Sequence, residues 1–229
     1  MKVGIIPARY GSTRFPGKPL ALICGKPMLQ YVYESSIASQ VFDAVYIATD
    51  DIQIERVATD FGASVVLTSN TLHSGTDRVN AAVDRLLFQK KISDVSVVVN
   101  IQGDEPLCPP ELFRELVTTF EQSDSEICTP IARIKNEEEF RNPNVVKVVV
   151  NTTKKALYFS RSPIPYSSEY SNESPHYKHI GLYAYSPKVL KYFANSAPTY
   201  LELQEKLEQL RLLEQGYSLQ CFETDYTSI

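Results

Sequence analysis

The loop at residues 9–20 is the first stretch of this sequence whose residue types and spacing could carry out chemistry. It follows a short apolar strand at residues 3–8 and combines two glycines and a Ser-Thr pair with three cations, Arg9, Arg14 and Lys18. Parallel α/β sheets bind ligands at the carboxyl ends of their strands, and glycines with cations suit a polyphosphate. The spacing fits neither a Walker A loop nor a G-x-G-x-x-G fingerprint. The loop predicts a triphosphate site, with a solvated basic loop as the alternative.

Asp104 is the second candidate for chemistry. It follows an apolar strand at residues 95–99, so its carboxylate should lie beside the first loop. Mg²⁺ takes one or two protein carboxylates there and completes its shell with phosphate oxygens. The amide of Gln102 both donates and accepts, which suits a hydroxylated ligand. The alternative is that Gly103 and Asp104 form only a turn that caps the next helix.

Residues 69–78 form a hydroxyl-rich loop that leads into a helix. Such a loop offers backbone N–H groups to an anion or forms a pocket for a base. The alternative is a well-capped loop in which Thr76 is the helix N-cap. We expect His73 to be a solvated loop histidine, because no second histidine lies at metal-ligand spacing.

Two further polar sets occur in the second half of the chain. Arg161 offers the bidentate geometry that recognises a carboxylate. Glu205, Glu208 and Gln209 follow the i, i+3, i+4 spacing and would form one polar face of the last helix. A solvated surface is the alternative for that face.

The elements that must position these residues alternate in the first half. Strands are expected at residues 44–48, 64–67 and 95–101, and amphipathic helices at 28–39, 51–61, 76–88 and 111–121. The strands are short and rich in β-branched residues, as buried parallel strands are. Asp50 is the expected N-cap of the second helix. This alternation predicts an α/β fold with a doubly wound, mostly parallel, three-layer sheet.

The second half changes character. The expected elements are strands at residues 145–150, 157–161 and 180–185 and helices at 186–195 and 199–215. A long excursion rich in Pro, Ser and Tyr covers residues 162–178, and loops of that length are usually functional or part of an interface. Since no linker divides the chain, we expect a single domain over residues 1–229.

Composition narrows the function classes. The 229 residues carry a net charge of −4, which argues against a general nucleic-acid binder. The four cysteines are scattered without a C-x-x-C pair and indicate reduced thiols in a cytosolic protein. No apolar run approaches the length of a membrane span. We therefore expect a cytoplasmic protein without membrane insertion.

Several motifs taken together point to one family. They are the opening at residues 6–20, Ala-Thr-Asp-Asp at 48–51, Ser-Gly-Thr-Asp-Arg at 74–78, Gln-Gly-Asp-Glu-Pro at 102–106, and the segments at 142–149, 158–166, 179–185 and 207–211. Through them almost the whole chain resembles the 3-deoxy-manno-octulosonate cytidylyltransferases, also called CMP-Kdo synthetases. The opening is shared with other sugar nucleotidyltransferases, whereas the last three motifs point to Kdo, the eight-carbon sugar acid of lipopolysaccharide.

The resemblance implies a nucleotide-diphospho-sugar transferase-like fold with an inserted β excursion. Residues 1–130 would mainly bind CTP, and residues 131–229 would mainly bind the sugar and form a homodimer, with much of the interface at 162–178. The implied reaction is Mg²⁺-dependent: the anomeric 2-hydroxyl of Kdo attacks the α-phosphorus of CTP and releases pyrophosphate. Such a reaction requires alignment and charge stabilisation more than covalent catalysis by the protein.

The resemblance also implies roles for individual residues. Arg9, Ser12, Arg14 and Lys18 would hold the triphosphate, and Ser69 and Arg78 would lie near the cytidine. Asp104 would hold Mg²⁺, with Arg9, Lys18 and Asp104 the catalytic set. Gln102 would touch the sugar, and the Kdo pocket would be completed by Arg161 on the sugar carboxylate and by His179, Tyr183, Glu208 and Gln209.

The sequence departs from the family pattern at its end. The family continues after the strand at residues 219–222 into Gly-Val-Asp-Thr-Pro-Glu-Asp, whose first Asp is a second metal ligand. The sequence stops at Ile229 before that motif, and Asp225 is not its equivalent. We therefore expect weak metal binding without nucleotide. Two alternatives stay open: a cytidylyltransferase for a nine-carbon sialic acid, and a nucleotide- or sugar-binding protein that no longer catalyses.

Overall fold

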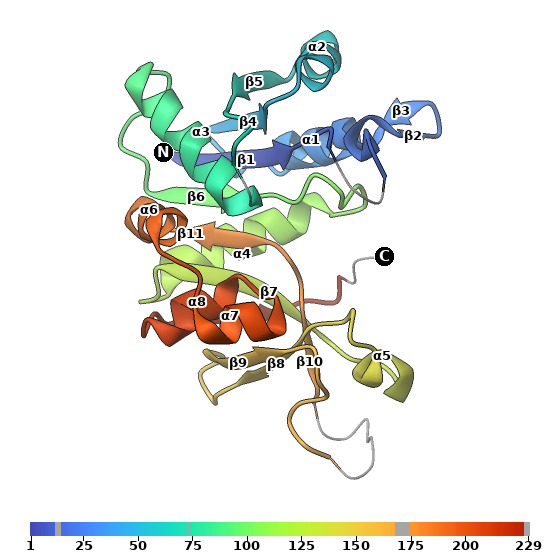
Figure 1. The fold of residues 1–229 in the computed structure, drawn as a ribbon, viewed down its shortest axis with the longest axis vertical. Coiled ribbons are helices and arrows are strands. Elements are labelled where there is room, and N and C mark those ends of the chain that lie inside the picture. Colours follow the sequence, from blue (N-terminus) through green and yellow to red (C-terminus); the bar gives the residue numbers. More distant parts are fainter. Residues whose placement is uncertain (12–14, 73, 168–174, 227–229) are drawn as a thin grey trace.

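A ten-stranded sheet with helices on both faces forms the centre of the molecule (Figure 1). The computed structural model describes residues 1–11, 15–72, 74–167 and 175–226. The strand order is β5-β4-β1-β6-β11-β7-β10-β8-β9, and β12 pairs with β7. The strands are β1 (Lys2–Ala8), β4 (Ala44–Thr49), β5 (Ser64–Leu67), β6 (Val97–Asn100), β7 (Ile127–Arg133), β8 (Lys147–Val150), β9 (Ala156–Ser160), β10 (Tyr177–His179), β11 (Tyr183–Tyr185) and β12 (Gln220–Glu223). A separate hairpin joins β2 (Leu22–Ile23) to β3 (Lys26–Pro27).

Strand direction divides the sheet into two regions. Strands β5, β4, β1 and β6 pair in parallel, as the alternation of strands and helices predicts. From β11 onward the strands pair antiparallel, except that β12 is parallel to β7. Strands β8 and β9 are joined by a short turn, which permits only antiparallel pairing. The predicted three-layer α/β fold is confirmed, but the sheet is mixed and not mostly parallel: its parallel pairs join β5, β4, β1 and β6, and β7 with β12.

The helices bury one core on each face of the sheet. On one face α1 (Met28–Ala38), α2 (Ile52–Asp60) and α4 (Pro110–Gln122) contribute side chains such as Leu29, Ile54 and Phe113. On the other face α3 (Gly75–Phe88) and α6 (Pro187–Asn195) contribute Leu86 and Phe193. None of the helices in the described ranges is long and apolar enough to cross a membrane. The two cores fix the strand ends that carry the polar loops.

Two helix N-caps differ from the sequence predictions by one or two residues. Asp51, not Asp50, caps α2, because its carboxylate accepts from the N–H groups of residues 53 and 54. Ser74, not Thr76, caps α3 in a capping box with Asp77. The structure thereby leaves the side chains of Asp50 and Thr76 available for other contacts, and both contribute to the site described below.

The prediction of a single helix at residues 199–215 is wrong, because the structure has two helices there, α7 (Tyr200–Glu205) and α8 (Gln209–Glu214). Lys206 ends α7 with a left-handed backbone conformation, φ 55°. The chain turns there because Arg211 folds back onto Glu202, with Nε 2.7 Å from Oε2 in a buried ion pair. Glu205 and Glu208 therefore do not share one helical face.

The hydrophobic pattern did not indicate every element: the hairpin of β2 and β3, strands β7 and β10 and helix α5 were not expected. Strand β7 lies inside the sheet although it contains Pro130, and α5 (Glu137–Arg141) follows it. The predicted strand at residues 180–185 is shorter, because Thr129 donates to the carbonyls of Ile180 and Leu182 and the chain bends there. Residues 168–174 of the predicted excursion lie outside the described residues, and its end forms β10.

Candidate active site

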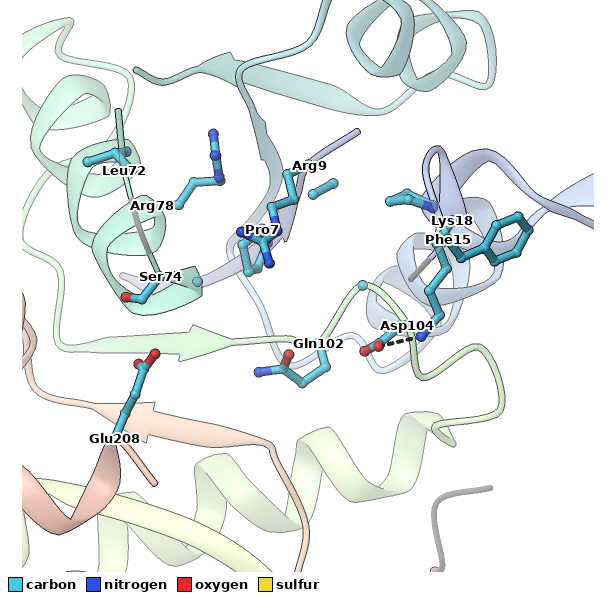
Figure 2. A pocket seen from close by; sticks show the side chains of 14 residues that line it. Pro7, Arg9, Phe15, Lys18, Leu72, Ser74, Arg78, Gln102, Asp104 and Glu208 are labelled. Carbon is cyan, nitrogen blue, oxygen red and sulfur yellow. Dashed lines mark hydrogen bonds and ion pairs between the residues drawn. The ribbon is translucent and has the colours of Figure 1, made fainter. Parts of the chain in front are cut away.

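A hollow of about 580 Å³ opens where strands β1 and β6 end (Figure 2). Its walls come from the loop after β1, the segment at residues 15–19, the loop that leads into α3 and the loop after β6. The polar lining includes residues whose side chains carry charge or hydrogen-bonding groups: Arg9, Lys18, Ser74, Arg78, Gln102, Asp104 and Glu208. The hollow thus lies at the carboxyl ends of parallel strands, where open α/β sheets bind ligands.

Lys18 and Asp104 face each other across one end of this hollow. Lys18 Nζ lies 2.6 Å from Asp104 Oδ2, and both side chains are partly exposed. Lys18 follows the loop after β1 and Asp104 follows β6, so the pairing of these parallel strands brings the two together. The structure therefore places the predicted triphosphate cation beside the predicted metal ligand.

Arg78 forms a buried side of the same hollow, where its guanidinium is paired with Asp50. Its side chain is 4% exposed, and Nη1 lies 2.5 Å from Thr68 Oγ1 and 3.3 Å from Asp50 Oδ1. Asp50 can reach Arg78 because Asp51 caps α2 in its place. The ion pair fixes the guanidinium at the start of α3, and a buried arginine held in this way is pre-organised for a planar or anionic ligand.

A second hollow of about 250 Å³ adjoins the first. Both are lined by Gly75, Gln102 and Glu208, which therefore mark the boundary between them. Glu208 Oε2 accepts from the hydroxyl of Thr76 at 3.1 Å. Partial removal from water raises the pKa of Glu208 above its ordinary value. A ligand in one hollow can therefore meet a ligand in the other at this boundary.

Unpartnered polar atoms distinguish the second hollow. Within the described ranges, four buried side-chain atoms of its lining have no hydrogen-bond partner: Asn100 Oδ1, His179 Nε2, Tyr183 OH and Gln209 Nε2. Buried polar groups in proteins are nearly always paired, since an unpaired one costs about 1–3 kcal/mol. Four of them around one space indicate a polar ligand that supplies the missing partners.

Aromatic packing holds this wall in place. The rings of His179 and Tyr183 lie 5.1 Å apart, and Tyr183 stacks on Tyr185 at 5.5 Å. Burial lowers the pKa of His179 to about 3 and raises that of Tyr183 well above its ordinary value. Both side chains are therefore uncharged at neutral pH and present hydrogen-bonding groups without charge.

The predicted site residues fall into three groups. The structure brings Arg9, Lys18, Arg78, Gln102 and Asp104 to the first hollow and His179, Tyr183, Glu208 and Gln209 to the second. Ser12, Arg14 and His73 lie outside the described residues. Ser69 and Arg161 are described but lie outside both linings.

Ser69 is engaged within its own loop. Its Oγ lies 2.8 Å from Thr71 Oγ1, and its loop enters the first hollow at Leu72 and Ser74 instead.

Arg161 is engaged with backbone carbonyls. Its Nε donates to the Glu205 carbonyl at 2.9 Å and its Nη1 to the Pro143 carbonyl at 3.0 Å. Its predicted role as a ligand of a sugar carboxylate stays a prediction.

Sequence reasoning missed Asn100 as a site residue. It is 3% exposed and ends β6, two residues before Gln102. A polar residue that closes an otherwise apolar run, directly before a predicted ligand loop, is the signal that could have found it. Its place opposite Tyr183 in the sheet depends on the antiparallel pairing of β6 with β11.

A hollow lined by arginine and lysine side chains at the ends of parallel strands, with a second polar hollow beside it, suits a nucleotide-dependent transferase that binds a nucleotide and a polar second substrate. Comparison with known proteins identifies the family of transferases to which the chain belongs. A family model described as Cytidylyltransferase matches residues 3–221. The chain therefore belongs to the cytidylyltransferase family and is an enzyme of the nucleotidyltransferase class.

Relatives and a solved structure agree with this assignment. A 3-deoxy-manno-octulosonate cytidylyltransferase from Thermodesulfovibrio yellowstonii is 45% identical over 98% of this chain and 90% of its own length. An 8-amino-3,8-dideoxy-manno-octulosonate cytidylyltransferase from Shewanella pealeana is 45% identical over 94% of this chain and 86% of its own length. The solved structure of CMP:2-keto-3-deoxy-manno-octonic acid synthetase complexed with CTP superposes with a TM-score of 0.90 at 38% identity, covering 100% of this chain and 93% of that one.

Proposed function

We propose that this protein transfers CMP from CTP to the anomeric 2-hydroxyl of 3-deoxy-manno-octulosonate, giving CMP-Kdo and pyrophosphate. The observation that carries the proposal is the pair of adjoining hollows: one is lined by Arg9, Lys18 and Arg78, and the other holds four buried polar atoms without a hydrogen-bond partner among the described residues. The first suits the triphosphate of CTP, and the second suits a hydroxylated sugar. The similarity to proteins named for this activity supports the assignment.

The boundary between the hollows is where the reaction would take place. A sugar hydroxyl beside Gln102 and Glu208 would face the α-phosphorus of a nucleotide in the first hollow. The hydroxyl oxygen would form a bond to the α-phosphorus and give up its proton to solvent, as the bond from that phosphorus to the bridging oxygen of the β-phosphate breaks and pyrophosphate leaves. Arg9 and Lys18 would offset the charge on the phosphates, and the walls would hold the reactants in line.

Asp104 would hold Mg²⁺. Its carboxylate is exposed in the nucleotide hollow, and Mg²⁺ usually takes one or two protein carboxylates together with phosphate oxygens and water. Among the side chains that the structure describes, no three His, Cys, Asp or Glu gather into a metal cluster. The single carboxylate of Asp104 fits a metal ion that arrives bound to the triphosphate. That ion would neutralise phosphate charge. We further infer a homodimer that acts in the cytoplasm.

The relative from Shewanella pealeana supplies a second candidate substrate, the 8-amino-3,8-dideoxy analogue of Kdo. Pyrophosphate release with CTP, Mg²⁺ and each sugar acid separates the candidates. We expect turnover with Kdo. Faster turnover of a nine-carbon sialic acid would contradict the proposal. Calorimetric CTP binding without turnover of any sugar acid would instead indicate a binding protein.

A further inference from the structure

Glu105, the neighbour of Asp104, is held by a tyrosine from a distant part of the chain. The hydroxyl of Tyr226 donates to Glu105 Oε2 at 2.9 Å, and this hydrogen bond is partly buried. Asp104 lines the nucleotide hollow, whereas Glu105 and Tyr226 line a separate, narrow cavity. The two adjacent carboxylates therefore have different surroundings, and Tyr226 fixes the one that lies outside the nucleotide hollow.

Tyr226 is itself anchored to the sheet. It follows β12, where the backbone N–H of Thr224 donates to the carbonyl of Ile131 in β7 at 2.9 Å. The backbone N–H of Tyr226 then donates to Thr224 Oγ1 at 3.2 Å. The tyrosine side chain also packs against the core to which α4 contributes. Its hydroxyl is therefore a fixed point for the loop that carries Glu105.

The loop after β6 is also fixed near both of its ends. Near its start, Gly103 lies so close to β1 that a Cβ atom there would be 3.1 Å from the carbonyl oxygen of Pro7. Near its end, the carbonyl of Cys108 accepts from the hydroxyl of Ser35 in α1 at 2.5 Å. The side chains between these two points decide how firmly the middle of the loop is held.

Two described side-chain contacts hold the middle of this loop. The first is the exposed pair of Asp104 with Lys18, which would separate when Lys18 meets phosphate and Asp104 meets Mg²⁺. The second is the contact of Glu105 with Tyr226, which involves neither ligand and would persist during that exchange. Metal ligands depend on such supporting contacts, because the groups behind them fix their orientation.

We propose, resting on the function proposed above, that Tyr226 and Glu105 are positioning residues for the metal ligand Asp104. Tyr226 holds the Glu105 carboxylate outside the nucleotide hollow, so the loop presents Asp104 alone to the ion. Glu105 thus supports Mg²⁺ binding without touching the ion. The opposite arrangement, in which Glu105 turns into the hollow as a second metal ligand, is an outcome that the test can detect.

The test measures how much Mg²⁺ strengthens CTP binding. Calorimetric titration with CTP, in Mg²⁺ and in EDTA, gives two dissociation constants, and their ratio is the Mg²⁺ enhancement. Tyr226→Phe keeps the ring but removes the donor. It should lower the enhancement about three- to tenfold, the scale of one hydrogen bond, and leave CTP affinity in EDTA unchanged. A loss of general stability would instead weaken binding equally in both conditions.

Tyr31→Phe is the matched control. The hydroxyl of Tyr31 donates to the carbonyl of Ile23, also at 2.9 Å and partly buried, and Tyr31 lies outside the linings of both hollows. The control variant should retain the wild-type enhancement.

Variants of Glu105 separate positioning from metal ligation. Glu105→Gln keeps an acceptor for Tyr226 and should retain the wild-type enhancement. Glu105→Ala should match Tyr226→Phe, and the double variant should lose no more than either one, because both changes remove the same contact. Denaturant unfolding shows whether each variant is folded. Glu105→Ala becomes the deciding variant if Tyr226→Phe does not fold.

Three results would overturn the inference. They are an unchanged enhancement in folded Tyr226→Phe, additive losses in the double variant, and equal CTP affinity of the wild type in Mg²⁺ and in EDTA. A loss in Glu105→Gln as large as in Glu105→Ala would also overturn it, because Glu105 would then bind the ion itself. Failure of the wild type to bind CTP in either condition would overturn the proposed function instead.

Discussion

Lys18 Nζ lies 2.6 Å from Asp104 Oδ2, so the cation expected to hold the triphosphate is paired with the carboxylate expected to hold magnesium. The side chains are 38% and 51% exposed, and exposed ion pairs contribute only about 0–1 kcal/mol. A triphosphate with its metal ion could therefore separate the pair at little cost. Lys18 would then pair with a phosphate group, and Asp104 would pair with the metal ion.

Lys18→Ala should weaken CTP binding and turnover. The variant loses one charge-assisted contact to phosphate, which corresponds to about 1.5–3 kcal/mol. Calorimetric titration with CTP measures the loss. Lys26→Ala is the matched control, because Lys26 forms an equally short and exposed pair with Glu34 away from the hollow. Equal CTP affinity of Lys18→Ala and Lys26→Ala would show that the first loop is not the triphosphate site.

Asp104→Asn should shift the magnesium dependence of the reaction. The amide keeps the shape of the side chain but loses the charge that Mg²⁺ requires. We expect a higher Mg²⁺ midpoint for pyrophosphate release and a change in unfolding free energy below about 1 kcal/mol, because the pair with Lys18 is exposed. Glu34→Gln provides the control in an equally exposed ion pair. A midpoint identical to that of the wild type would contradict the role assigned to Asp104.

Arg161→Ala distinguishes a structural role from a ligand role. The guanidinium now donates to the carbonyls of Pro143 and Glu205, next to the turn that carries Glu208 and Gln209. Loss of these bonds should lower the free energy of unfolding by about 1–3 kcal/mol and raise the KM for Kdo by loosening that turn. Denaturant unfolding measures the first effect. Arg141→Ala, in an exposed i,i+4 pair, should change stability by less than about 0.5 kcal/mol.

The ligand role predicted from sequence gives a different pattern for Arg161→Ala. The KM for Kdo would then rise while the free energy of unfolding stayed at the wild-type value.

His179 should make the protein less stable in acid. Burial lowers its pKa to about 3, whereas in the unfolded chain it titrates near 6.5. Between these values the unfolded state binds one more proton, so stability rises with pH by up to about 1.4 kcal/mol per unit and levels off above 6.5. His179→Asn should flatten this slope between pH 4 and 6.5 without altering it above pH 7. Equal pH slopes of the unfolding free energy in the wild type and in His179→Asn would show that His179 is protonated in the folded protein between pH 4 and 6.5.

The sequence predicted the elements with regular hydrophobic patterns and the polar loops that follow them. Lys18 and Asp104 could be placed together because parallel strands end at one edge of a sheet. Asn100 could not be placed, because its neighbour Tyr183 comes from an antiparallel strand far along the chain. The turn at Lys206 was also hidden, since residues 199–215 are consistent with one amphipathic helix, whereas in the structure a buried ion pair of Arg211 with Glu202 joins two helices across that turn.

Phosphorus NMR of CTP, Kdo and Mg²⁺ with the enzyme tests the central claim most directly. We expect the three CTP resonances to disappear while a single phosphodiester resonance and pyrophosphate grow in equal molar amounts, and only when Kdo is present. Release of phosphate with CDP, pyrophosphate formation without a sugar acid, or an unchanged CTP spectrum would contradict CMP transfer to the anomeric hydroxyl.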